Sequence, residues 1–136
     1  EDFLAEQNNV QQSQWSPPEE GWLKVNVDDA MDRVNYLAGL GAVVKNHKGE
    51  TVAAAVSTFK SSGDVELSEA KAVLWGMQAA AKAGATSVIL ESDSKGVIEL
   101  INNKRSTLTD TFWVIFDIIE AKKIFQNFKA QHVLRM

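Results

Sequence analysis

Alternating apolar and polar residues predict three consecutive β-strands in the first half of the chain. Residues 22–28 alternate strictly, with one face made of Leu23, Val25 and Val27 and the other of Lys24, Asn26 and Asp28. Residues 38–45 predict a second strand, and residues 50–59 predict a third after the turn-forming segment 46–49. Because the links between the three strands are short, we expect them to form an antiparallel meander.

The hydrophobic period then changes from two residues to that of an α-helix. Residues 66–83 place apolar side chains at helical spacing, and Gly84 follows as a helix-ending residue. A short apolar run, Ser87–Asp93, is typical of a strand buried on both faces. Two further helices, separated by a break at residues 102–109, precede a fifth strand at 128–134. The order βββαβααβ predicts an α/β fold with a mixed five-stranded sheet, three antiparallel strands and then two parallel ones, flanked by helices.

Three acidic residues lie at positions that this fold would bring together. Asp28 closes the first predicted strand, Asp93 closes the fourth, and Glu69 lies in the first turn of the helix between them, facing its apolar stripe. Gathered carboxylates strongly raise one another's pKa unless a cation neutralises them, and hard divalent cations prefer oxygen ligands. We therefore interpret Asp28, Glu69 and Asp93 as ligands of Mg²⁺, with Mn²⁺ as the alternative ion. Two such ions could clamp a phosphodiester and activate a water.

Each of these acids also has a purely structural interpretation. Asp28 could be a turn residue at a strand end, and Glu69 could be a first-turn acid stabilised by the helix dipole. Asp93 could act with Ser94 to cap the following helix, a role that is compatible with metal binding. His132 lies within the alternating pattern of the fifth strand, so we expect it to be structural.

Composition narrows the classes of function. The 136 residues include no cysteine, which excludes disulfides and thiolate metal sites and favours a reducing, intracellular compartment, either nucleus or cytoplasm. No apolar stretch is long enough to span a bilayer, so we expect no membrane association. Residues 1–20 hold five acids and no Lys or Arg and are rich in Gln, which predicts a tail or linker before a domain at residues 21–136. The other 13 acids and 14 bases leave that domain at +1, a weak footprint for a polyanionic partner.

Four segments in order resemble the ribonuclease H domain, most closely the plant RNase H-like group related to non-LTR retroelements. The likeness covers roughly residues 21–135, and the segments are Leu23–Ala30, Ala38–Glu50, Leu67–Ala80 and Val88–Ile98. The resemblance implies an RNase H-like fold and Mg²⁺-dependent endonucleolytic cleavage of the RNA strand of an RNA–DNA hybrid, leaving a 3′-hydroxyl. It also implies that the first three metal-binding, catalytic acids of that family are Asp28, Glu69 and Asp93.

The chain departs from the family pattern in two respects. Asp29 stands where the family has a glycine after its first aspartate. The family's fourth acid lies in a helix after a His-Val-x-Arg segment, whereas this sequence ends at Met136 soon after His132. We therefore expect a C-terminally truncated domain that lacks that helix. The family's basic, substrate-binding insertion is also missing, because residues 102–110 hold only two bases, Lys104 and Arg105.

Two other functions stay open beside hybrid cleavage. One is a catalytically inactive RNase H-like module that binds nucleic acid or protein. The other is a different nuclease on the same scaffold, such as a DNA exonuclease or an integrase-type enzyme. We expect a monomer or one part of a larger polypeptide, with a nucleic acid, foremost an RNA–DNA hybrid, as its partner.

Overall fold

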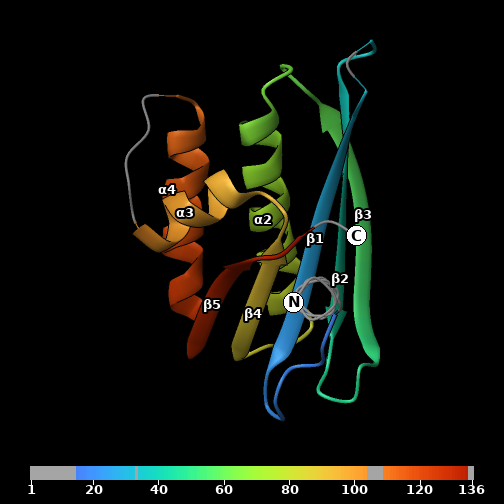
Figure 1. Ribbon diagram of the computed structural model, residues 1–136, viewed down its shortest axis with the longest axis vertical. Helices are drawn as coiled ribbons and strands as arrows, with labels where there is room; N and C mark the ends of the chain where they lie inside the picture. The colour runs from blue at the N-terminus through green and yellow to red at the C-terminus, as the bar shows by residue number, and fades with distance from the viewer. Residues whose placement is uncertain (1–14, 33, 104–108, 135–136) are drawn as a thin grey trace, which may run out of the picture.

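The structure is a computed structural model that describes residues 15–32, 34–103 and 109–134 (Figure 1). Its strands are β1 (Leu23–Asp32), β2 (Leu37–Lys45), β3 (Thr51–Lys60), β4 (Ser87–Ser92) and β5 (Asn127–His132). Its helices are α2 (Val65–Lys82), α3 (Lys95–Asn103) and α4 (Thr111–Ala121), and α4 continues into a 3₁₀ turn, η1 (Lys122–Ile124).

The five strands form one sheet in the order β3-β2-β1-β4-β5. β2 pairs antiparallel with both β1 and β3, whereas β4 pairs in parallel with both β1 and β5. The predicted mixed sheet and the predicted order of elements are therefore confirmed. The pairing of β1 with β4 is the part that matters for function, because it sets the strands that carry Asp28 and lead to Asp93 side by side.

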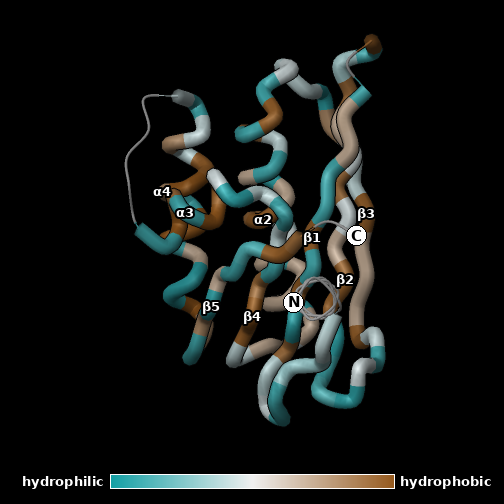
Figure 2. The backbone as a smooth tube through the Cα atoms, in the orientation of Figure 1, coloured by the Kyte–Doolittle hydropathy of each residue, from teal (hydrophilic) through white to brown (hydrophobic). Residues whose placement is uncertain are grey.

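The helices cover one face of the sheet (Figure 1). Residues of α2, α3 and α4 share one hydrophobic core with inward-facing strand positions such as Val25, Leu40 and Leu90. Figure 2 shows hydrophobic residues along β4 and α4 and a hydrophilic turn between β2 and β3. Because side chains alternate along a strand, Lys24, Asn26 and Asp28 belong to the opposite face. We call that opposite side the open face.

A glycine lets α2 approach β1 closely. A Cβ added at Gly76 would overlap Val27 Cγ1 and lie 3.3 Å from Val25 Cγ1. The helix starts after Asp64, whose side chain accepts a hydrogen bond from a backbone N–H of the first turn at 3.1 Å. It ends before Gly84, which has a φ of +84° that favours glycine. α2 is thus fixed at both ends and packed directly on the strand that carries Asp28.

Two element boundaries differ from the predictions in ways that affect the site. β1 continues to Asp32 because β2 pairs with it to its last residue, so Asp28 lies inside the strand rather than at its end. α2 begins at Val65, one residue earlier than predicted, and its first-turn acid is Glu66. Glu69, the fifth residue of α2, therefore lies in the second turn rather than the first. In the part of the chain that the structure describes, no helix is long and apolar enough to cross a membrane.

Candidate metal centre

The parallel pairing of β1 with β4 points Asp28 and Asp93 to neighbouring positions. The last pair along the two strands is Asn26 with Glu91, and the two aspartates lie two residues further on. Residues two apart in a strand share a face. Asn26 and Glu91 contact each other on the open face, where Asn26 Nδ2 donates to Glu91 Oε1 at 2.9 Å. The strand geometry therefore directs Asp28 to the open face, and Asp93 directly follows the last residue of β4 at the same end of the sheet.

Asp28 is exposed and lies beside a shallow apolar groove of about 280 Å³ that β1, β2 and β3 form. The backbone N–H of Asp29 donates to Asp28 Oδ1 at 2.9 Å, which orients one carboxylate oxygen. Asp29 itself is half-buried, and strand alternation assigns its side chain to the helix-covered face. The carboxylate that departs from the family pattern therefore does not share a face with Asp28.

Asp93 is half-buried in the short connection between β4 and α3. The Ser94 N–H donates to Ser92 Oγ at 3.0 Å, and the Val97 N–H donates to Ser94 Oγ at 3.4 Å. Ser94 thus caps α3 from a buried position. Because a serine hydroxyl accepts this capping bond, the cap does not depend on the Asp93 carboxylate, and the two serines fix the backbone on both sides of it.

Glu69 lies on α2, which covers the face of the sheet opposite to the open face. It is half-buried between the buried residues Ser68 and Ala70, in agreement with the predicted orientation toward the apolar stripe. The helix dipole acts mainly within the first turn, so the second-turn position gives little support to a dipole role for Glu69. The start of α2 lies near the start of α3: a Cβ added at Gly96 would lie 3.8 Å from Glu66 Oε2.

The three carboxylates do not form a ready ligand group. Among residues 15–32, 34–103 and 109–134, no three Asp, Glu, His or Cys side chains are placed to hold a metal ion together. Asp28 belongs to the open face, Glu69 lies on the helix that covers the opposite face, and Asp93 follows the end of β4. The donor set still fits Mg²⁺ in its chemistry, because all three side chains offer carboxylate oxygens. The parallel pairing of β1 with β4 also sets the strand that carries Asp28 beside the strand that leads to Asp93.

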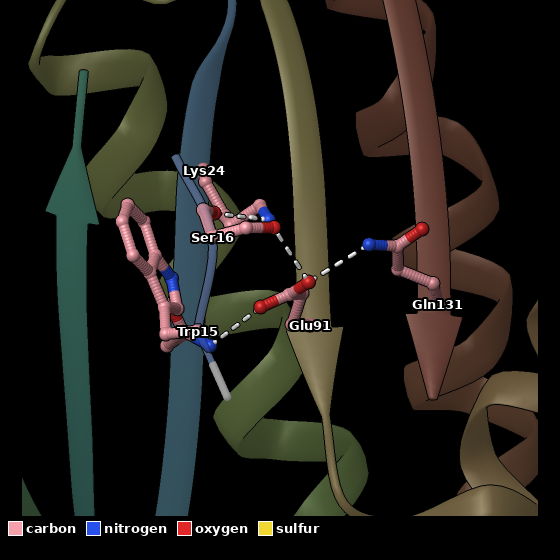
Figure 3. Close-up of polar contacts among 6 residues, drawn as sticks. Trp15, Ser16, Lys24, Glu91 and Gln131 are labelled. Carbon is pink, nitrogen blue, oxygen red and sulfur yellow. Dashed lines mark hydrogen bonds and ion pairs between the residues drawn. The ribbon is translucent and has the colours of Figure 1, made fainter. Parts of the chain in front are cut away.

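A buried charged network on β1, β4 and β5 includes Asn26 and Glu91, each two residues before one of the aspartates (Figure 3). Lys24 Nζ is 3.3 Å from Glu91 Oε2, and the two side chains are only 6% and 7% exposed. Glu91 also accepts hydrogen bonds from Asn26 Nδ2 at 2.9 Å and from Gln131 Nε2 at 2.8 Å. One carboxylate thus joins β1, β4 and β5. Glu91 was not among the predicted site residues, although its place as an acid inside the apolar run before Asp93 is visible in the sequence.

Residues Trp15–Pro18, which we call the strap, lie over this network (Figure 3). Trp15 Nε1 donates to Asn26 Oδ1 at 2.8 Å, and Lys24 Nζ donates to the Ser16 carbonyl oxygen at 2.6 Å. Two ammonium groups also lie 5.1 and 5.0 Å from the centroid of the Trp15 ring, those of Lys24 and Lys45. The strap belongs to the predicted tail, yet it contacts the sheet through several polar and aromatic interactions.

The turn after β1 holds an acid of a different kind. Asp32 accepts hydrogen bonds from Asn35 Nδ2 at 2.8 Å, from the Asn35 N–H at 3.1 Å and from the Val34 N–H at 3.0 Å. These bonds, first among them the one from the Asn35 side chain, lower the pKa of Asp32 from its ordinary value of 3.8. Asp32 therefore stabilises the hairpin turn.

Lys104 and Arg105, the two bases at the place of the family's basic insertion, lie outside the described residues.

Comparison with known proteins places residues 26–136 in the family described as reverse transcriptase-like. A search among curated proteins gave no significant match. RNase H1 from the halophilic archaeon Halobacterium salinarum superposes with a TM-score of 0.77 and 22% identity, over 84% of this chain and 86% of that one. The N-terminal RNase H domain of a Mycobacterium tuberculosis protein, fused to maltose-binding protein, gives 0.75 and 20%, over 84% and 83%. LC11-RNase H1 in complex with an RNA/DNA hybrid gives 0.71 and 18%, over 83% and 86%. These similarities show an RNase H-like fold.

Proposed function

The chain belongs to the reverse transcriptase-like family, and from that premise we propose that it is a Mg²⁺-dependent ribonuclease that cleaves the RNA strand of RNA–DNA hybrids endonucleolytically. Its RNase H-like fold supports this proposal, and a protein of the same fold, LC11-RNase H1, has been solved with an RNA/DNA hybrid. We also propose that the chain is a member of the plant RNase H-like group that its motifs resemble, and that it acts inside the cell.

The observation that carries the proposal is the register of β1 and β4. β1 and β4 pair up to Asn26 and Glu91, and each of two aspartates 65 positions apart in the sequence follows one member of that pair by two residues, which supports their proposed closeness. Two like charges at such a spacing repel each other in the absence of a counter-ion. A fold whose core pairing imposes this arrangement is therefore well suited to a divalent cation, and a phosphodiester is a substrate that such a cation can activate.

We assign three residues to the metal site: Asp28 on the open face, Asp93 after the end of β4, and Glu69 on the helix that covers the opposite face. Mg²⁺, bound as a pair of ions, would supply charge neutralisation at the phosphate and a water of lowered pKa. The Asp29 N–H holds one oxygen of Asp28 in place. The Ser92–Ser94 connection holds the backbone of Asp93. Hydrolysis would form a bond between the water oxygen and phosphorus and break the P–O3′ bond, leaving a 3′-hydroxyl and a 5′-phosphate.

A second candidate function is a binding module without catalytic activity. It is favoured by the observation that the three carboxylates are not gathered into one ligand group among the described residues. A module of this kind would bind a hybrid, another nucleic acid or a protein through the RNase H-like surface and would leave the RNA intact. The two candidates make opposite predictions for turnover, so one experiment separates them.

The experiment measures cleavage of an RNA–DNA hybrid labelled at the RNA 5′ end, with Mg²⁺, with Mn²⁺ and with a chelator. Single-stranded RNA, double-stranded RNA and double-stranded DNA serve as competing substrates. Asp93→Asn and Asp28→Asn test the site, and Asp117→Asn, which changes an exposed acid on α4, is the matched control. We expect metal-dependent cleavage of the hybrid by wild type and the control. Each site variant should lose on the order of a hundredfold or more in rate, equivalent to about 3 kcal/mol.

Three results would contradict the proposal in different ways. Binding of the hybrid without turnover would select the inactive module. Cleavage of DNA in preference to the hybrid would select another nuclease on this scaffold. Metal-dependent cleavage that is equal in wild type and Asp93→Asn would show that the activity does not use the assigned site.

A further inference from the structure

We propose that Glu91 and the strap are positioning elements of the metal centre, which hold β1 and β4 in the register that sets Asp28 beside Asp93. This inference rests on the proposed function and deepens it. It assigns a role to the buried network that the three candidate ligands leave unexplained. Neither Glu91 nor the strap would touch the metal ion or the substrate, because each acts through the strands that carry the ligands.

The first reason is the position of the network in the two strands. Glu91 precedes Asp93 by two residues, and Asn26 precedes Asp28 by two residues, so each polar partner lies close along the chain to a candidate ligand. The hydrogen bond from Asn26 to Glu91, at 2.9 Å, crosses between β1 and β4 at the last pair before the aspartates. Any slip of one strand along the other would have to break this bond.

The second reason is the chemistry of a buried carboxylate. A charge that is 7% exposed must be compensated, and Glu91 is compensated by Lys24 at 3.3 Å on β1 and by Gln131 at 2.8 Å on β5. The buried face of β1 and β4 already opposes a slip by one residue, because such a slip would turn its apolar side chains to the other face. A slip by two residues would keep the same faces buried, and the buried ion pair opposes it because its partners would be separated. The network therefore specifies the strand alignment more tightly than the ladder alone.

The third reason is the strap, which contacts the two network residues of β1, Lys24 and Asn26 (Figure 3). Trp15 binds the Asn26 side-chain oxygen at 2.8 Å, so the Asn26 amide is oriented with its nitrogen toward Glu91. The Ser16 carbonyl accepts from Lys24 at 2.6 Å, which satisfies the ammonium group on the side away from Glu91. Loss of the strap would leave both β1 partners exposed to water and free to change rotamer.

A metal site needs its ligands held within about 0.5 Å, and loss of a supporting interaction typically weakens metal binding by about 10–100-fold. The absence of cysteine from the chain allows this positioning to be measured without any metal. Neighbouring strands lie about 4.8 Å apart, within the Cα separation of about 4.4–6.8 Å that a disulfide requires. The proposed closeness of the two aspartates therefore predicts that the pair Asp28→Cys and Asp93→Cys forms a disulfide, and its equilibrium against glutathione reports the effective concentration of the two thiols.

The first measurement compares that effective concentration in the double-cysteine protein alone and with Glu91→Gln or Trp15→Ala added. Ile118→Val, which removes a buried methyl group from α4 outside the three strands, is the control for a general loss of stability. We expect at least a tenfold fall with Glu91→Gln, a severalfold fall with Trp15→Ala and no change with the control. Unchanged effective concentrations in both test variants, with circular dichroism showing a folded chain, would overturn the proposal. If Glu91→Gln does not fold, Trp15→Phe decides, because it keeps the ring over the lysines and removes only the N–H bond to Asn26.

The second measurement is the dissociation constant of Mn²⁺, read from the electron paramagnetic resonance signal of the free ion in the cysteine-free protein. We expect Glu91→Gln to raise this constant about tenfold and Ile118→Val to leave it unchanged. The same constant in Glu91→Gln and wild type would contradict the positioning role. If wild type binds no Mn²⁺ but the thiol pair still depends on Glu91 and Trp15, the proposed function fails while the positioning role stands. The two failures are therefore distinguishable.

Discussion

Replacing Gly76 with alanine tests how closely α2 must approach β1. The added Cβ would overlap Val27 Cγ1 and lie 3.3 Å from Val25 Cγ1. Both valines are buried, at 7% and 0% exposure, and their β-branched side chains have little freedom to rotate away. The helix must therefore move outward from the strand, and Glu69, two turns before Gly76, would move with it relative to Asp28.

Two opposing effects set the size of the change. Alanine is favoured over glycine inside a helix by about 1 kcal/mol, whereas overpacking a close-packed core costs about 1–3 kcal/mol. Because two side chains are crowded at once, we place the cost at the upper end of that range. The expected result is a net loss of about 1–2 kcal/mol in the free energy of unfolding. For a domain of this size, that corresponds to a decrease in Tm of roughly 3–10 °C.

Urea unfolding followed by circular dichroism measures this change, and Gly41→Ala is the matched control. Gly41 lies in β2, and an added Cβ there would meet no atom within 4 Å. We expect Gly41→Ala to be neutral or stabilising, and we expect adding Val27→Ala to Gly76→Ala to recover part of the lost stability. A Gly76→Ala protein as stable as wild type, with no coupling to Val27, would refute the close-packing argument.

Three further predictions concern other parts of the structure. Asp64→Ala should lower the free energy of unfolding by about 0.5–2 kcal/mol in urea titrations, because the cap of α2 is lost, and an unchanged value would show that the cap contributes nothing. Glu91→Leu should lower the free energy of unfolding by about 3–5 kcal/mol, because the buried Lys24 loses its ion-pair partner. The double variant Lys24→Met with Glu91→Leu should be close to wild type in stability. Equal losses in the single and double variants would contradict this. Asn35→Ala should raise the pKa of Asp32 toward 3.8, as followed by carbon NMR of the carboxyl group. Since the pKa of Asp32 is depressed in the folded state, the stabilisation from this carboxylate is complete above pH 3.8 and is lost as the pH falls through the lower folded value. An Asp32 pKa that Asn35→Ala leaves unchanged would show that Asn35 does not cause the depression.

The fold was predictable because its signals are local. Strict alternation over residues 22–28 and helical spacing over residues 66–83 specify elements that the structure contains, to within a few residues at each end. The end of β1 was missed because its last residues, which include Asp29 and Asp32, carry no apolar alternation and are strand only through pairing with β2. A tertiary contact there overrides the local pattern.

The site was predictable only in part, because some of its residues are related only through tertiary contacts. The predicted order of elements led to the expectation that the fold brings Asp28, Glu69 and Asp93 together, and the structure pairs β1 with β4. The role of Glu91 depends on Lys24, which lies 67 positions away in the sequence, and no local pattern connects them. Trp113 is 67% exposed although it is a large apolar residue, because α4 is apolar on almost every side and its sequence does not single out one buried face.

Asp28, Glu69 and Asp93 should bind one metal ion together, although Asp28 and Glu69 belong to elements on opposite faces of the sheet. Paramagnetic broadening of backbone amide signals by substoichiometric Mn²⁺ tests this most directly, because it acts only near the bound ion. We expect the amides of all three residues to broaden together at the lowest Mn²⁺ additions and to recover when excess Mg²⁺ is added. Broadening confined to Asp28 and Asp93, or centred elsewhere in the chain, would contradict it.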